Sequence, residues 1–193
     1  MAERGLLIVL SAPSGCGKST LTRRLLELRP GLRFSVSATT RAPRVGETDG
    51  VDYYFIDRDT FRRMIENDEF LEYAQYVDNS YGTPRAPVER EMAAGRDVLL
   101  DIETNGALQV MRRCPEAVTV FLMPPSFEEL ERRLTTRGKD NPEVIARRLE
   151  EAKRECLLAD RYAYNIVNDD VERAAGEFGA IIDKERAKRF FPT

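Results

Sequence analysis

"LSAPSGCGKST", residues 10–20, joins an apolar segment to the start of an amphipathic one. Its spacing is that of a phosphate-binding loop (P-loop), Gly-x-x-x-x-Gly-Lys-Ser/Thr, except that Ala12 stands where the first glycine is usual. An alanine fits there if its φ angle is negative, because its methyl group then causes no strain. We therefore predict a strand–loop–helix unit that binds the phosphates of a nucleoside triphosphate.

Each part of this loop has a chemical role. Gly15 and Gly17 let backbone N–H groups turn toward phosphate oxygens, and Lys18, at the start of the helix, reaches the terminal phosphates. The hydroxyl of Ser19 is a predicted ligand of Mg²⁺, the cofactor expected with ATP. Cys16 is interpreted as a passive loop residue, with a thiol of lowered pKa at a helix start as the alternative. The ATP-binding residues predicted here are Ala12, Pro13, Ser14, Gly15, Cys16, Gly17, Lys18, Ser19 and Thr20.

Composition limits the class of protein. The chain has 193 residues, of which 42% are hydrophobic and 33% charged, which suits one domain with a buried core. A net charge of −3 argues against broad nucleic-acid binding, and the apolar run at residues 6–10 is too short to cross a membrane. Three cysteines without metal-ligand spacing or a leader peptide favour a reducing cytoplasm.

Histidine is absent from the sequence. This excludes histidine general bases, phosphohistidine intermediates and histidine-ligated metals. The groups left for any chemistry are carboxylates, Lys, Arg, hydroxyls and backbone amides, with a bound cation as an optional addition.

Short apolar runs alternate with longer amphipathic stretches, which predicts an α/β fold with a parallel sheet and helices on both faces. The expected strands are Leu6–Leu10, Phe34–Ser37, Val98–Ile102, Val118–Met123 and Tyr164–Val167. The expected helices are Lys18–Leu28, Asp59–Asn67, Pro84–Ala94, Asn105–Arg113, Phe127–Arg137, Glu143–Asp160 and Val171–Lys188. Residues 37–87 interrupt the alternation with aromatic and β-branched segments, so a small, partly antiparallel insertion is expected there.

A P-loop alone does not say what happens to the triphosphate. A switch, a motor and a phosphotransferase all remain possible, although the Asn-Lys-x-Asp signature of switch GTPases is missing. A second anion site would indicate transfer. Arg41 and Arg44, with nearby Tyr53, have the chemistry to bind a phosphate monoester, although a solvated basic loop has the same composition.

The strand "VLLDIE" ends in Asp101 and Glu103, at the edge where open parallel sheets bind ligands. Strand alternation places both carboxylates on one side. Asp101 is predicted to orient Mg²⁺ through water or to orient an arginine of the acceptor site; capping of the next helix is the structural alternative.

The chain resembles a guanylate kinase of the nucleoside-monophosphate kinase family. The matching segments are "SAPSGCGKST", "SVSATTRAPRVGETDGVDYYF", "FLEYAQYVDNSYGT", "VLLDIE", "RRLTTRG" and "IVNDD", in the family's order from about residue 6 to 190. The resemblance implies a P-loop core (1–36, 88–125, 158–193), a GMP-binding region (37–87) and a helical lid (126–157). It departs from the family pattern at Glu103, where Asp is common, and at Asn105, where Gln is common.

The resemblance also implies residue roles. GMP phosphate would be held by Arg41, Arg44, Tyr53 and Tyr81, and guanine would be read by Ser37, Glu72, Thr83 and Glu103. In the lid, Arg133 and Arg137 would contact ATP, and the residues implied to be catalytic are Lys18, Arg44, Arg137 and Arg148.

The implied reaction is phosphoryl transfer from MgATP to GMP, with these two nucleotides as partners and no nucleic acid or membrane. Two rivals stay open at this point. One is a P-loop kinase for another monophosphate. The other is a non-catalytic guanylate-kinase-like module that binds phosphorylated peptides.

Overall fold

Strand β1 (Leu7–Ser11) is apolar from Leu7 to Leu10 and buried throughout, because both of its faces are covered. Its side chains alternate: Ile8 and Leu10 enter one buried cluster, whereas Leu7 and Val9 enter another. A continuous apolar strand is typical of a parallel sheet between two layers of helices. The computed structural model, which describes residues 4–76, 78–136 and 141–190, has this arrangement.

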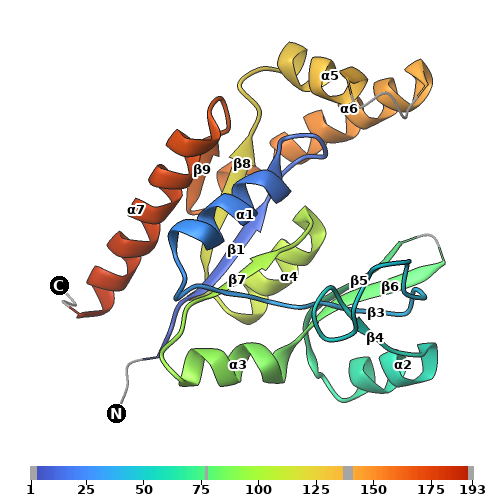
Figure 1. Ribbon diagram of the computed structural model, residues 1–193, viewed down its shortest axis with the longest axis vertical. Coiled ribbons are helices and arrows are strands. Elements are labelled where there is room, and N and C mark those ends of the chain that lie inside the picture. Colours follow the sequence, from blue (N-terminus) through green and yellow to red (C-terminus); the bar gives the residue numbers. More distant parts are fainter. Residues whose placement is uncertain (1–3, 77, 137–140, 191–193) are drawn as a thin grey trace.

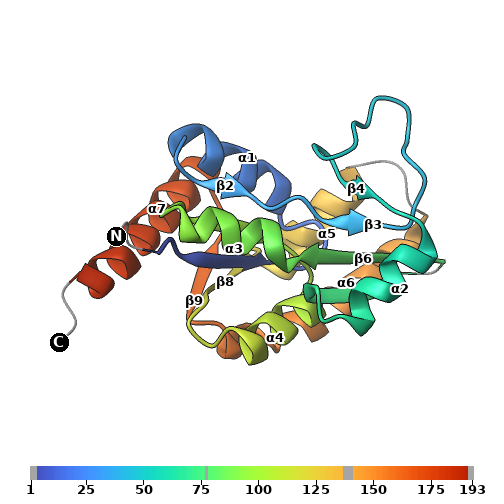
Figure 2. The same ribbon diagram turned by 90° about the horizontal axis from the view of Figure 1, so that it is seen from below.

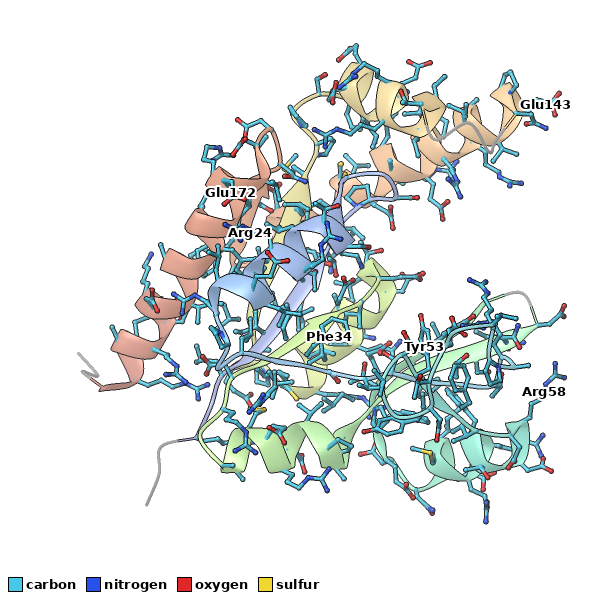
Figure 3. The ribbon with its side chains drawn as sticks, in the orientation of Figure 1. Arg24, Phe34, Tyr53, Arg58, Glu143 and Glu172 are labelled. Carbon is cyan, nitrogen blue, oxygen red and sulfur yellow. The ribbon has the colours of Figure 1, made fainter. Side chains whose placement is uncertain are left out.

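The core sheet has five parallel strands in the order β2–β7–β1–β8–β9. Helices α1 and α7 line one cluster, and α3 and α4 line the other; Figure 2 shows α1 and α4 on opposite sides of β1. Arg24 of α1 and Glu172 of α7 also form an ion pair of 2.8 Å, and both are labelled in Figure 3. The bounds are β2 Arg33–Phe34, β7 Val98–Asp101, β8 Val118–Met123, β9 Tyr164–Val167, α1 Lys18–Leu28, α3 Arg85–Ala93, α4 Thr104–Arg113 and α7 Val171–Phe190.

A second, four-stranded sheet has the order β4–β3–β6–β5 and mixed pairing, with β3 parallel to β4 and antiparallel to β6. Its strands are β3 Ala38–Thr39, β4 Tyr54–Phe55, β5 Phe70–Tyr76 and β6 Asn79–Pro84. Helix α2 (Arg58–Glu66) packs on it through Phe61, whose ring centroid lies 4.5 Å from that of Phe70.

Helices α5 (Phe127–Thr136) and α6 (Pro142–Cys156) lie side by side. Leu130 and Leu134 of α5 reach the core cluster of α1 and α7. Figure 1 shows the α5–α6 pair and the second sheet extending from the same side of the core, the side of the P-loop.

The predicted fold class, a P-loop core with a mixed insertion and a helical pair, is confirmed. The predicted strand Phe34–Ser37 is wrong: Phe34 ends β2, and the extended chain then crosses to β3 in the second sheet. The predicted helix Glu143–Asp160 is too long, because α6 ends at Cys156 and a 3₁₀ turn, Ala159–Arg161, follows. Among the described residues, no helix is both long and apolar enough to span a bilayer.

Glu155, in the last turn of α6, joins this helix to the core. Its Oε1 accepts a 3.4 Å hydrogen bond from Thr104 Oγ1, at the start of α4. Burial raises the pKa of Glu155 to about 7, and the negative charges of Glu151 and Glu103 add to the effect; Thr104 and the Lys18 charge oppose it.

We expect Glu155 to make stability depend on pH. Because its pKa in the folded protein exceeds the ordinary value of 4.5, the folded state binds more protons between these two values. The free energy of unfolding therefore falls as pH rises from about 4.5 to 7, and stays lower above that window. Urea unfolding at pH 5 and pH 8 should show a smaller decline for Glu155→Gln than for the wild type.

Glu143→Gln, at an exposed position near the other end of α6, is the matched control and should keep the wild-type decline. An unchanged decline in Glu155→Gln would contradict the expectation.

Candidate functional site

The P-loop lies between β1 and α1, and Lys18 is the first residue of the helix. Gly15 and Gly17 have φ angles of 92° and 85°, which L side chains rarely adopt. Among the described non-glycine residues only Asp68 has a positive φ, so the expectation for Ala12 is confirmed. The missing first glycine leaves the loop unstrained.

Space also restricts the two glycines. A Cβ atom on Gly15 would lie 2.9 Å from side-chain atoms of Leu130 and Leu134 of α5. A Cβ atom on Gly17 would lie 2.6 Å from Nδ2 of Asn168. The loop is therefore packed directly against α5 and the end of β9.

Lys18 and Asp101 meet at the carboxyl ends of β1 and β7. Lys18 Nζ lies 2.5 Å from Asp101 Oδ1 and donates to the carbonyl of Ile102 at 3.1 Å. The other oxygen of Asp101, Oδ2, accepts from Thr22 Oγ1 at 3.1 Å. The alternative that Asp101 caps the next helix is wrong, since Glu103 is the N-cap residue of α4 and makes no side-chain cap bond.

A divalent cation would find hard oxygen donors here. Ser19, Thr22 and Asp101 line one surface hollow beside the P-loop. Mg²⁺ is held in proteins by one or two such groups together with water and substrate phosphates, and this small donor set suits that mode. Within the described part of the chain, no cluster of three or more His, Cys, Asp or Glu forms a separate metal site.

Cys16 is fully buried in the loop. Burial raises the pKa of its thiol to about 12. The lowered-pKa alternative is therefore wrong, and the passive interpretation fits the structure.

One cavity of about 390 Å³ connects the P-loop lysine with the predicted guanine-binding residues. Lys18 and Asp101 line it, together with residues of the second sheet and of the connection before that sheet. The predicted acceptor residues in its wall are Ser37, Tyr53, Glu72, Tyr81 and Glu103. The structure thus brings the donor and acceptor halves of the predicted site together.

Glu72 is the buried carboxylate of this cavity, with 6% of its surface exposed. Thr83 Oγ1 donates to its Oε1 at 2.6 Å. Burial raises the pKa of Glu72, and the nearby Glu103 adds to this, while the Thr83 hydrogen bonds oppose it. A Cβ atom on Gly106 would lie 2.6 Å from Oε2 of Glu72. A side chain at position 106 would therefore displace the carboxylate of Glu72, although the sequence signalled this glycine only as part of Asn105-Gly106.

The loop that carries Arg41 and Arg44 is held together by Glu47, a residue that the sequence did not point to. Glu47 Oε1 lies 2.8 Å from Arg41 Nη2, and Oε2 accepts from the backbone N–H of Arg44 at 2.7 Å. Hydrogen bonds from Arg41 and from the Arg44 backbone lower the pKa of Glu47. The guanidinium of Arg41 also lies 5.5 Å from the ring centroid of Tyr53, whose ring is 6.0 Å from that of Tyr81. Arg41 thus lies beside both tyrosines and Arg44 lies on an exposed turn; neither arginine is among the residues that line the cavity.

Arg133, on α5, is fixed from two sides: Nε donates to Glu129 Oε1 at 2.8 Å and Nη2 to the carbonyl of Asn168 at 3.0 Å. The side chain of Asn168 in turn donates to the carbonyl of Cys16 at 2.6 Å. Asn168 therefore links α5 to the P-loop; its sequence signal was the segment "IVNDD". Arg148 is half-buried on α6, and Arg137 lies outside the described residues.

Comparisons with known proteins agree with this geometry. The sequence model of the family described as guanylate kinase matches residues 4–185. The guanylate kinase of Thermus thermophilus is 55% identical over 96% of this chain and 84% of its own length, and that of Lactococcus lactis is 53% identical over 96% and 90%. The crystal structure of guanylate kinase from Anaplasma phagocytophilum superposes with a TM-score of 0.74 at 39% identity, covering 95% of this chain and 87% of that one. The chain belongs to the guanylate kinase family.

Proposed function

We propose that this chain transfers the γ-phosphoryl group of MgATP to GMP, and to dGMP, to give ADP and GDP or dGDP in purine nucleotide metabolism. The observation that carries the proposal is that Lys18 of the P-loop and the buried carboxylate of Glu72 line the same cavity. A cavity with these two chemistries suits a reaction in which a triphosphate and a purine monophosphate meet directly.

Direct in-line transfer accounts for the absence of histidine. An oxygen of the GMP phosphate forms the new bond to the γ-phosphorus as the bond to the bridging oxygen of ADP breaks. The attacking phosphate is already anionic near neutral pH, so a strong general base is dispensable. Positioning and charge neutralisation then supply the catalysis.

On this proposal the cationic groups contact different phosphates. Lys18 contacts the transferring phosphoryl group, and Arg41 and Arg44 hold the phosphate of GMP. Arg133, Arg137 and Arg148 approach the ATP phosphates from the helical lid, whose closure excludes competing water. Mg²⁺, near Ser19 and Asp101, would neutralise charge on the phosphates when it is bound.

Guanine recognition rests on hydrogen-bond pairing. Guanine presents its N1–H and N2–H₂ donors side by side, and a carboxylate such as Glu72 accepts both; adenine lacks this pair. Hydrogen bonds to charged groups contribute ~1.5–3 kcal/mol each, so two of them favour GMP by roughly 10²–10⁴. Ser37, Thr83 and Glu103 are proposed to complete the contacts with the base.

We further infer that the protein works in the cytoplasm, since all three cysteines are free thiols. Its proposed partners are the small molecules ATP and GMP. The non-catalytic alternative lacks support, because such modules typically lose the P-loop, whereas Gly15, Gly17, Lys18 and Ser19 are all present.

Substrate preference tests the function. In a coupled assay of ADP release with GMP, dGMP, AMP, CMP, UMP and IMP, we expect turnover with GMP and dGMP to exceed that with the other monophosphates. The absence of a guanine preference would contradict the proposal. ATP binding by calorimetry separates a kinase from a peptide-binding module, which would not bind ATP.

Two substitutions should affect different kinetic parameters. Lys18→Ala removes a charge that acts on the transferring group, so kcat should fall about 10²–10³-fold. Glu72→Ala should lower the GMP-to-IMP ratio of kcat/KM about 10–100-fold, because IMP keeps the N1–H donor and lacks the N2 amino group.

The matched controls are Lys188→Ala, on α7, and Glu69→Ala, an exposed carboxylate just before β5, and both should behave like the wild type. If Glu72→Ala left the GMP-to-IMP ratio unchanged, Glu72 would not be the residue that reads the base.

A further inference from the structure

Strand β5 is the outer strand of the second sheet, so only one of its edges pairs with another strand, β6. The other edge faces α4, and Figure 1 shows α4 between the core strands and this sheet. An edge strand presents backbone N–H and C=O groups that need partners when they are covered. Glu72 lies on this edge strand.

Gln109, on α4, supplies such partners for the residue that follows Glu72. Its Nε2 donates to the carbonyl of Tyr73 at 2.8 Å, and its Oε1 accepts from the N–H of Tyr73 at 3.3 Å. The side-chain amide therefore bonds to both polar groups of one residue, as a neighbouring strand would. Two bonds from one planar group fix the orientation of this backbone as well as its position.

Gly106 and Arg113 lie three and four residues from Gln109, on the same face of α4. Gly106 provides the space for Oε2 of Glu72. Arg113 Nη1 donates to the carbonyl of Phe70 at 2.9 Å. This face of α4 therefore follows β5 on both sides of Glu72.

A β-bulge makes this support necessary. Phe70 lies opposite Pro84 and Glu72 opposite Thr83, so the pairing register shifts between Phe70 and Glu72. The residue between them, Leu71, is buried in the core cluster that includes Val110 of α4. A bulge redirects the side chains around it and weakens the regular ladder. The direction of Glu72 therefore depends on contacts outside the sheet as well as on the hydrogen bond from Thr83.

We propose that Gln109 is a positioning residue for guanine recognition: by bonding to both backbone groups of Tyr73, it fixes the direction in which Glu72 presents its carboxylate to the base. The inference rests on the proposed role of Glu72 as the residue that reads guanine. Gln109 acts on the base through Glu72 and the β5 backbone. Since α4 also begins directly after β7, the same helix ties the base-reading carboxylate to the Asp101 edge of the core sheet.

Gln109→Met tests this, because it keeps the size of the side chain and removes both hydrogen-bonding groups. The GMP-to-IMP ratio of kcat/KM should fall about tenfold, the loss expected when one of two hydrogen bonds to the carboxylate is misaligned. KM for ATP should stay within twofold of the wild type. If Gln109→Met does not fold, Gln109→Asn tests the same point, since it withdraws the amide by one methylene.

Two control variants distinguish an effect on the orientation of Glu72 from a general loss of packing between α4 and β5. Gln75→Met makes the same substitution at an exposed position of β5 and should leave the ratio unchanged. Arg113→Met removes the bond to the carbonyl of Phe70, which lies on the other side of the bulge from Glu72 and Tyr73. It should therefore lower the melting temperature and leave the ratio within twofold of the wild type.

The outcomes are distinct when Glu72→Ala is measured beside these variants. A low ratio in Gln109→Met, with Gln75→Met and Arg113→Met close to the wild type, supports the proposal. A low ratio in Glu72→Ala with a wild-type ratio in Gln109→Met overturns the proposal and leaves Gln109 as a structural contact between α4 and β5. A wild-type ratio in Glu72→Ala overturns the base-reading assignment itself, and this proposal with it.

Discussion

The parallel pairing of β1 with β7 is the constraint on which the site depends. Leu10 lies opposite Asp101 in this pairing, so the P-loop and the end of β7 reach the same edge of the sheet. Lys18 and Asp101 can then form their ion pair of 2.5 Å. A shift of register by one residue would turn Asp101 to the other face of the sheet. The pairing is secured by the apolar side chains that fill both faces of the two strands.

The second sheet contributes chemistry that the core lacks. Burial of Glu72 disfavours its charged form and so raises its pKa. The hydrogen bond from Thr83 stabilises the charged carboxylate and offsets part of this effect. A carboxylate already removed from water and held in place loses less freedom when a base binds. The space and the backbone support of Glu72 come from α4, through Gly106 and Gln109, and its hydroxyl partner Thr83 comes from β6.

The loop that carries Arg41 and Arg44 has an internal acidic partner. Glu47 bonds to the side chain of Arg41 and the backbone of Arg44 at once. The negative charge of Glu47 offsets the positive charges of the two arginines. The Arg133–Asn168–Cys16 connection similarly holds α5 against the P-loop. Both arrangements include bonds to backbone groups: the N–H of Arg44 in the first, and the carbonyls of Asn168 and Cys16 in the second.

The sequence by itself determined the P-loop, the parallel core and the resemblance to a family, because these depend on local spacing and on apolar periodicity. The resemblance, and not the residue pattern alone, pointed to Glu72 and Thr83, which the structure shows to be bonded to each other. The sequence misplaced the ends of elements where an extended chain passes from one sheet to another, since alternation looks the same in both. Only the tertiary structure decided the roles of Glu47, Gly106, Gln109 and Asn168. Gly106, Gln109 and Asn168 act on partners that are distant in the sequence and brought close by folding, and no short-range pattern records those partners. Glu47 acts within its own loop, on Arg41 and Arg44, but the sequence does not show which of the nearby carboxylates makes these bonds.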